Sequence, residues 1–128
     1  MKVLDVLTRV YLQREALDRS IVFYEELFKE RCRLRFSHSA AHLELAQVGR
    51  VLLIAGLPEH LEPFRATRAT FLVDDLDAFQ RLLERSGAQI ISPPKRVPTG
   101  RNMRVRNPDG LLVEYVEHDP AIAERSSQ

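Results

Sequence analysis

The sequence has little of what disulfide-rich proteins and membrane proteins require. It has one cysteine, Cys32, and no tryptophan. A single cysteine excludes an internal disulfide framework and favours a reducing compartment. Long apolar runs are also missing, and the first ten residues already include Lys2, Asp5 and Arg9, which excludes a signal peptide and a membrane span there. We therefore expect a cytoplasmic protein with no membrane partner.

Basic and acidic residues are nearly balanced, with 19 basic and 18 acidic residues in the chain. A net charge of +1 gives no overall field for gathering nucleic acid, so we expect no nucleic-acid partner. The densest basic run extends from Lys95 to Arg106 and contains five cations, no acid and no aromatic residue. Such a run is typical of a solvated edge strand, which is our prediction. The alternative interpretation is an anion-binding site.

The main positive signal is an internal repeat. The stretches Thr8–Asp18 and Thr67–Asp77 both begin with Thr-Arg, both end with Leu-Asp, and both turn from alternating apolar residues to helical spacing. Short apolar runs then follow each helix. The order β-α-β-β-β is thus predicted twice. The predicted strands are 7–13, 32–37, 41–48, 50–55, 68–73, 88–92, 101–106 and 111–117, and the helices are 15–30 and 75–87.

The length of 128 residues suits one domain of the α+β class made from this repeat. We expect module one at about 4–55 and module two at about 67–118. A turn-rich segment with two prolines, residues 56–66, is predicted to link them. Residues 119–128 form a predicted tail.

Each predicted sheet has one helix, so the sheet face away from that helix must be covered in another way. Strand alternation places a mixed polar and apolar set of side chains on that face. Such a mixture is typical of a ligand cavity rather than of a packed core. The predicted cavity residues are Arg9, Tyr11, Leu53, Arg68, Thr70 and Glu114.

Three segments, "LDRSIVFYEEL", "FLVDDLDAF" and "NPDGLLVEYVEH", resemble the vicinal oxygen chelate superfamily, which includes glyoxalase I, bleomycin-resistance proteins and extradiol dioxygenases. The resemblance covers roughly residues 4–118. It implies two βαβββ modules in pseudo-twofold repeat, with curved sheets that form a half-open barrel around a cavity. It also implies a homodimer and, in the enzymes, a divalent metal held from the first and last strands of each module.

Alignment of the glycine turns of the two modules places Arg9, Leu53, Arg68 and Glu114 at the four ligand positions of that family. A guanidinium stays protonated and has no lone pair to give a metal. One carboxylate is too few for a zinc, iron or nickel site. We therefore expect no cofactor. The alternative is one divalent metal at a displaced site.

His42 and Glu44, spaced i, i+2 on one predicted strand, are candidates for a displaced metal site. A pair of solvent-facing side chains explains the same spacing. His38, His60 and His118 are predicted to lie at the surface.

Two functions remain open. The first is a metal-free small-molecule binding protein of the bleomycin-resistance kind, which sequesters a drug or metabolite and favours an anionic or carbonyl-bearing ligand. The second is a metal-dependent lyase, isomerase or dioxygenase. The arginines at the ligand positions favour binding over catalysis. A purely structural Arg–Glu–Arg cluster that joins the two modules explains the same residues, and the two interpretations do not exclude each other.

Overall fold

The computed structural model describes residues 1–122. The chain divides into two compact units. Unit 1 contains Met1–Leu7 and the chain from Thr67 onward, and unit 2 contains Thr8–Ala66. Of the predicted tail, residues 123–128 lie outside the described residues. Within residues 1–122, no helix is long and apolar enough to cross a membrane.

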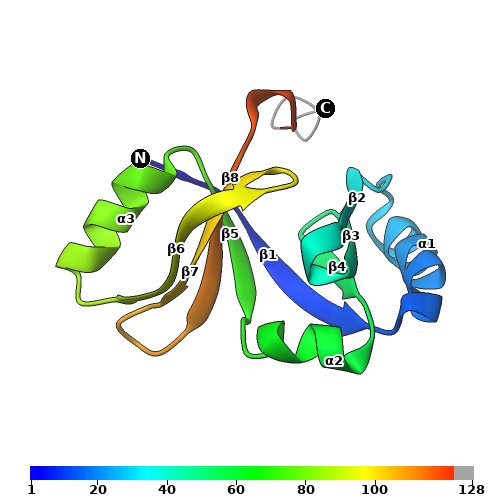
Figure 1. Ribbon diagram of the computed structural model, residues 1–128. Helices are drawn as coiled ribbons and strands as arrows, with labels where there is room; N and C mark the ends of the chain where they lie inside the picture. Colours follow the sequence, from blue (N-terminus) through cyan, green and yellow to red (C-terminus); the bar gives the residue numbers. More distant parts are fainter. Residues whose placement is uncertain (123–128) are drawn as a thin grey trace. The chain divides into compact units, whose positions relative to one another are not determined.

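Unit 2 follows the predicted order of one strand, one helix and three strands (Figure 1). Its elements are β1 (Val3–Leu12), the 3-10 turn η1 (Arg14–Ala16), α1 (Leu17–Phe28), β2 (Leu34–His38), η2 (Ser39–Ala41), β3 (Leu43–Val48) and β4 (Val51–Ala55). The segment 56–66, predicted as a linker, forms the short helix α2 (Pro58–Leu61) and the 3-10 turn η3 (Glu62–Phe64), and it belongs to unit 2.

Unit 1 repeats the order from Thr67 onward. Its elements are β5 (Ala69–Val73), α3 (Leu76–Arg85), β6 (Gln89–Val97), β7 (Gly100–Arg106) and β8 (Leu112–His118). The α+β class and the doubled β-α-β-β-β order are therefore confirmed. An aspartate caps α3: Asp75 accepts a hydrogen bond from the Ala78 amide at 3.1 Å.

The strands belong to one eight-stranded sheet, and the part of it in each unit, here called the sheet of that unit, is built in the same way. In unit 2 the strand order is β2-β3-β4-β1, and in unit 1 it is β1-β5-β8-β7-β6. The pairs β1–β4 and β5–β8 are parallel, whereas β2–β3, β3–β4, β6–β7 and β7–β8 are antiparallel. Strand β1 takes part in both sheets because its first residues belong to unit 1, where the Asp74 amide donates to the Lys2 carbonyl at 3.1 Å.

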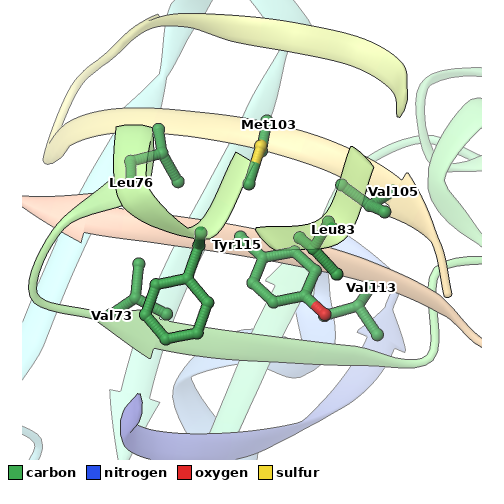
Figure 2. Close-up of a cluster of buried hydrophobic side chains, with 8 residues drawn as sticks. Val73, Leu76, Leu83, Met103, Val105, Val113 and Tyr115 are labelled. Carbon is green, nitrogen blue, oxygen red and sulfur yellow. The ribbon is translucent and has the colours of Figure 1, made fainter. Parts of the chain in front are cut away.

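Each unit buries its own apolar core against its own helix. In unit 1, Leu76 and Leu83 of α3 pack with Met103, Val105 and other strand side chains, and Figure 2 shows this cluster in close-up. In unit 2 the core side chains come from α1, β3 and β4. They are Leu17, Ile21, Ala46, Val48, Leu53 and Ala55. Because side chains alternate along a strand, each core also defines which residues face away from the helix.

Candidate functional site

A polar cluster lies on the face of the unit 1 sheet away from α3. On β8, Val113 and Tyr115 enter the core, so Glu114 between them faces the other side. Thr70 of β5 and Arg104 of β7 are the cross-strand neighbours of Glu114. The parallel and antiparallel pairings therefore bring three strands together at one carboxylate.

Both oxygens of the Glu114 carboxylate accept hydrogen bonds from side chains. The Thr70 hydroxyl donates to Oε1 at 3.0 Å, and the Asn102 amide donates to Oε2 at 2.7 Å. Thr70 is buried, and Asn102, Arg104 and Glu114 are half-buried. Two charge-assisted hydrogen bonds hold the carboxylate in one orientation.

His118 lies on the same face of β8 as Glu114, two positions further along and beyond Val116. It is half-buried, and burial lowers the pKa of its imidazole, while the Glu114 carboxylate acts in the opposite direction. The prediction that His118 lies at the surface is therefore wrong. We call Thr70, Asn102, Arg104, Glu114 and His118 the Glu114 cluster.

Thr70 and Glu114 are the two predicted cavity residues that the structure brings into direct contact in unit 1. The sequence analysis assigned no role to Asn102 and placed Arg104 only in a basic run. The signal for both was the alternation in "RNMRVR", where Met103 and Val105 enter the core. Pairing of this strand with β8 then places Asn102 and Arg104 beside Glu114.

Arg9 and Tyr11 form a separate pair in unit 2. The Arg9 Nε donates to the Tyr11 hydroxyl at 2.8 Å, and the guanidinium carbon lies 5.5 Å from the centre of the ring. The Tyr11 hydroxyl in turn donates to the Phe64 carbonyl, which ties β1 to the segment after α2. The prediction that Arg9 and Tyr11 share a strand face is confirmed by this contact.

Leu53 does not face a cavity. Its side chain is 0% exposed and packs in the core beneath α1 with Leu17 and Ile21. The pairing register shows which residue takes the predicted place. Tyr11 pairs with Ile54, just as Thr70 pairs with Glu114, so Ile54 is the counterpart of Glu114 in unit 2.

The error arises from the two glycine turns, which differ in length. Val48 pairs directly with Val51, so two residues, Gly49 and Arg50, connect β3 to β4. Arg106 pairs with Leu112, so five residues connect β7 to β8. Aligning the glycines therefore shifts β4 by one residue, and one residue is enough to move every side chain to the opposite face.

Arg68 lies immediately before β5 rather than within it. Its backbone amide donates to the Leu112 carbonyl at 3.0 Å, and the residue is exposed in the single chain. The strand head predicted at Arg68 is therefore one residue too early.

The donor set does not suit the divalent metal that the family implies. With the corrected register the four positions read Arg9, Ile54, Arg68 and Glu114, so one position out of four carries a metal ligand. Among residues 1–122, no group of three or more His, Cys, Asp or Glu side chains lies close enough to hold a metal.

The displaced site predicted at His42 and Glu44 is also not formed as a strand pair. His42 precedes β3 with φ of 59°, and its ring stacks on His60 at a centroid distance of 4.5 Å. Glu44 instead accepts a hydrogen bond from the Ser37 hydroxyl at 2.6 Å. The i, i+2 spacing therefore does not direct these two side chains to one ligand.

Two of the five cations in the basic run from Lys95 to Arg106 form ion pairs with acids. Arg96 forms two hydrogen bonds with Asp119, and Arg101 forms two with Asp77. These pairs hold β6 to the end of β8 and β7 to α3. For Arg96 and Arg101, these pairs support the prediction of a solvated strand edge over an anion site.

The profile of the Glyoxalase/Bleomycin resistance protein/Dioxygenase superfamily matches residues 6–115. The chain belongs to this superfamily. Its matched range contains both repeats and all of the Glu114 cluster except His118. The resemblance seen in the sequence is therefore confirmed. Among curated proteins, none matches the chain.

Solved structures agree with this placement. An uncharacterized, hypothetical protein from Methanosarcina mazei is 51% identical, with a TM-score of 0.85 over 93% of this chain and 95% of that one. Methylmalonyl-CoA epimerase from Mycobacterium tuberculosis is 20% identical, with a TM-score of 0.71 over 95% and 93%. A mutant of 4-hydroxymandelate synthase from Streptomyces coelicolor is 17% identical, with a TM-score of 0.59 over 88% and 48%. The last two show the shared fold alone.

Proposed function

We propose that this superfamily member is a metal-free binding protein for a small molecule with a carboxylate or carbonyl group, acting in the cytoplasm as a homodimer. The Glu114 cluster is its proposed polar contact site. The observation that carries the proposal is the engagement of both Glu114 oxygens by Thr70 and Asn102. A carboxylate used in this way is oriented by side chains rather than by a metal ion.

The chemistry of the cluster suits a polar organic ligand. The guanidinium of Arg104 carries five N–H donors, and His118 offers a ring nitrogen as donor or acceptor. These groups are half-buried, so water competes less for their hydrogen bonds to a ligand than it does at exposed groups. A ligand carbonyl or carboxylate would accept from Arg104, and a ligand hydroxyl would donate to Glu114.

The residues at the four ligand positions of the family favour sequestration of a ligand over catalysis. The metal-dependent alternative needs several protein ligands on one ion, and the corrected positions supply one carboxylate. The drug-binding and metabolite-binding versions of the proposal share this chemistry. They differ only in the apolar part of the ligand.

The proposal is tested by calorimetry with a panel of small molecules that carry a hydroxyl beside a carbonyl or carboxylate group, using Glu114→Gln and Asn102→Ala. The first variant removes the charge at nearly constant shape, and the second removes the donor to Oε2. For any molecule of the panel that binds, we expect either variant to weaken the affinity by at least about tenfold. This is the loss typical of removing a charge-assisted hydrogen bond.

Glu84→Gln is the matched control, because Glu84 is an exposed carboxylate on α3 of the same unit. It should leave the affinity unchanged. Equal affinity in all four proteins would show that the Glu114 cluster is not the ligand site.

A further inference from the structure

Three arginines gather at one end of the unit 1 sheet, on the face away from α3. Val105 of β7 enters the core (Figure 2), so its neighbours Arg104 and Arg106 face the other side. Arg106 pairs with Leu112 of β8. On the opposite side of β8, the Arg68 amide donates to the Leu112 carbonyl at 3.0 Å. Leu112 therefore has an arginine on the strand to either side.

Leu112 and Arg68 belong to the same face as the Glu114 cluster. Leu112 lies two residues before Glu114 on β8, and Arg68 lies two residues before Thr70. Thr70 and Glu114 are in contact on this face, and a period of two residues extends it to both of their predecessors. The three cations next to the Glu114 cluster form what we call the arginine patch, which consists of Arg68, Arg104 and Arg106.

The arginine patch carries positive charge in excess. Arg68 and Arg106 are exposed, and within residues 1–122 neither forms an ion pair with a carboxylate. Glu114 is the acidic residue on this face of β8, and its two oxygens already accept hydrogen bonds from Thr70 and Asn102. The two outer arginines can therefore bind an anionic group from a ligand.

The repeat provides an internal comparison for the arginine patch. The strand pairings identify the unit 2 residues that correspond to Arg104, Arg106 and Glu114. They are Leu45, Gln47 and Ile54, which are neutral and at most 9% exposed. The module therefore does not need charged side chains at these positions to fold. This contrast favours a binding role for the arginines of unit 1.

A phosphate group matches the spacing and charge of these donors. Guanidinium groups bind phosphate through pairs of parallel hydrogen bonds, and a phosphate monoester carries almost two negative charges at neutral pH. Arg68 and Arg106 lie about 10 Å apart between Cα atoms, one on each side of β8, so both can reach a phosphate held over Leu112. Leu112 is about 7 Å from Glu114 along the strand, a distance that a short carbon chain spans.

We propose that the ligand of the Glu114 cluster also carries a phosphate monoester, which Arg68 and Arg106 bind. This inference rests on the proposed function, because the other end of the ligand contacts the Glu114 cluster. The ligand class is then a phosphate ester of a small hydroxy or keto compound with about three or four carbons. Free phosphate shares the chemistry of the ester, and the measurements below separate the two.

Calorimetry at about pH 8 tests the inference with three- and four-carbon hydroxy acids, each with and without a phosphate monoester, such as 3-phosphoglycerate and glycerate. We expect the phosphorylated member of a pair to bind the wild type at least about tenfold more tightly, as is typical of hydrogen bonds between charged groups. Arg68→Gln and Arg106→Gln should remove most of this advantage. Neither variant should change the affinity for the unphosphorylated member.

Arg85→Gln is the matched control, because Arg85 is an exposed arginine of the same unit and lies on α3, across the sheet from the arginine patch. It should keep the full phosphate advantage. Circular dichroism of each variant confirms that it is folded. An advantage that survives both Arg68→Gln and Arg106→Gln, or equal affinity for the two members of each pair, would overturn the inference.

Inorganic phosphate alone distinguishes a failure of this inference from a failure of the proposed function. Phosphorus NMR titration at constant ionic strength should show weaker binding of inorganic phosphate than of the esters, a further loss in Arg68→Gln and Arg106→Gln, and no loss in Glu114→Gln. Inorganic phosphate that binds as tightly as the esters would overturn the inference. Loss of hydroxy-acid affinity in Glu114→Gln without any phosphate advantage would overturn the inference alone, and a phosphate advantage without any effect of Glu114→Gln would overturn the proposed function.

Discussion

At the scale of single residues, the carboxylate of Glu114 and the imidazole of His118 act on each other across one face of β8. Burial lowers the pKa of His118 from its ordinary value of 6.5, and the negative charge of Glu114 partly offsets that effect. Because the folded state keeps this histidine neutral, it binds fewer protons than the unfolded chain just below pH 6.5. Stability from this residue is therefore present above about pH 6.5 and is lost as the pH falls.

Glu114→Gln is predicted to lower the pKa of His118 further, because it removes the nearby negative charge that stabilises the imidazolium. NMR titration of the His118 ring protons measures the change. Glu84→Gln serves as the control, since Glu84 is an exposed carboxylate of the same unit and is not among the charges that act on His118. A rise in the His118 pKa in the variant would contradict the arrangement of the Glu114 cluster.

Gly100 begins β7 at a position with no room for a side chain. An added Cβ would lie 2.1 Å from the Glu117 carbonyl oxygen, and φ is +154°. Gly100→Ala is therefore predicted to reduce the free energy of unfolding by about 1–3 kcal/mol or more. Urea unfolding measures the loss.

Gly87→Ala is the matched comparison for this prediction. Gly87 also has positive φ, at +85°, but nothing lies within 4 Å of its added Cβ. Its cost is limited to backbone strain, about 1–2 kcal/mol. Equal losses in the two variants would show that steric contact at Gly100 has no effect.

At the scale of elements, the sequence predicted the strands and helices well because alternation and helical spacing are local. The predicted face of β5 and β8 was right, and Thr70 meets Glu114 as a result. The predicted face of β4 was wrong, because it depended on a turn length that glycine alone does not determine. The half-burial of His118 was also missed, since it depends on neighbours distant in the chain.

Leu53→Ala tests the corrected face of β4. Removal of a fully buried leucine from the core beneath α1 is predicted to cost about 2–5 kcal/mol of unfolding free energy. Leu57→Ala should change it by less than about 0.5 kcal/mol, because Leu57 is 41% exposed. If Leu53 instead lined an open cavity, the two variants would differ little in chemical denaturation.

At the scale of the whole molecule, the doubled module allows the ligand positions of the family to be compared between the two repeats. The repeat places equivalent residues at equivalent positions of the sheet. The four ligand positions of the family can therefore be identified from the strand pairings of β1 with β4 and of β5 with β8. Here that set is two arginines, one isoleucine and one glutamate. The sequence revealed three of these four, and the pairing of β1 with β4 was needed for the fourth.

The most direct measurement is the metal content of protein purified without chelator, by inductively coupled plasma mass spectrometry. The account predicts far less than one zinc, nickel, iron or manganese ion per chain, and no change between the wild type and Glu114→Gln. One ion per chain in the wild type that is lost in Glu114→Gln would contradict it and favour the metal-dependent enzyme.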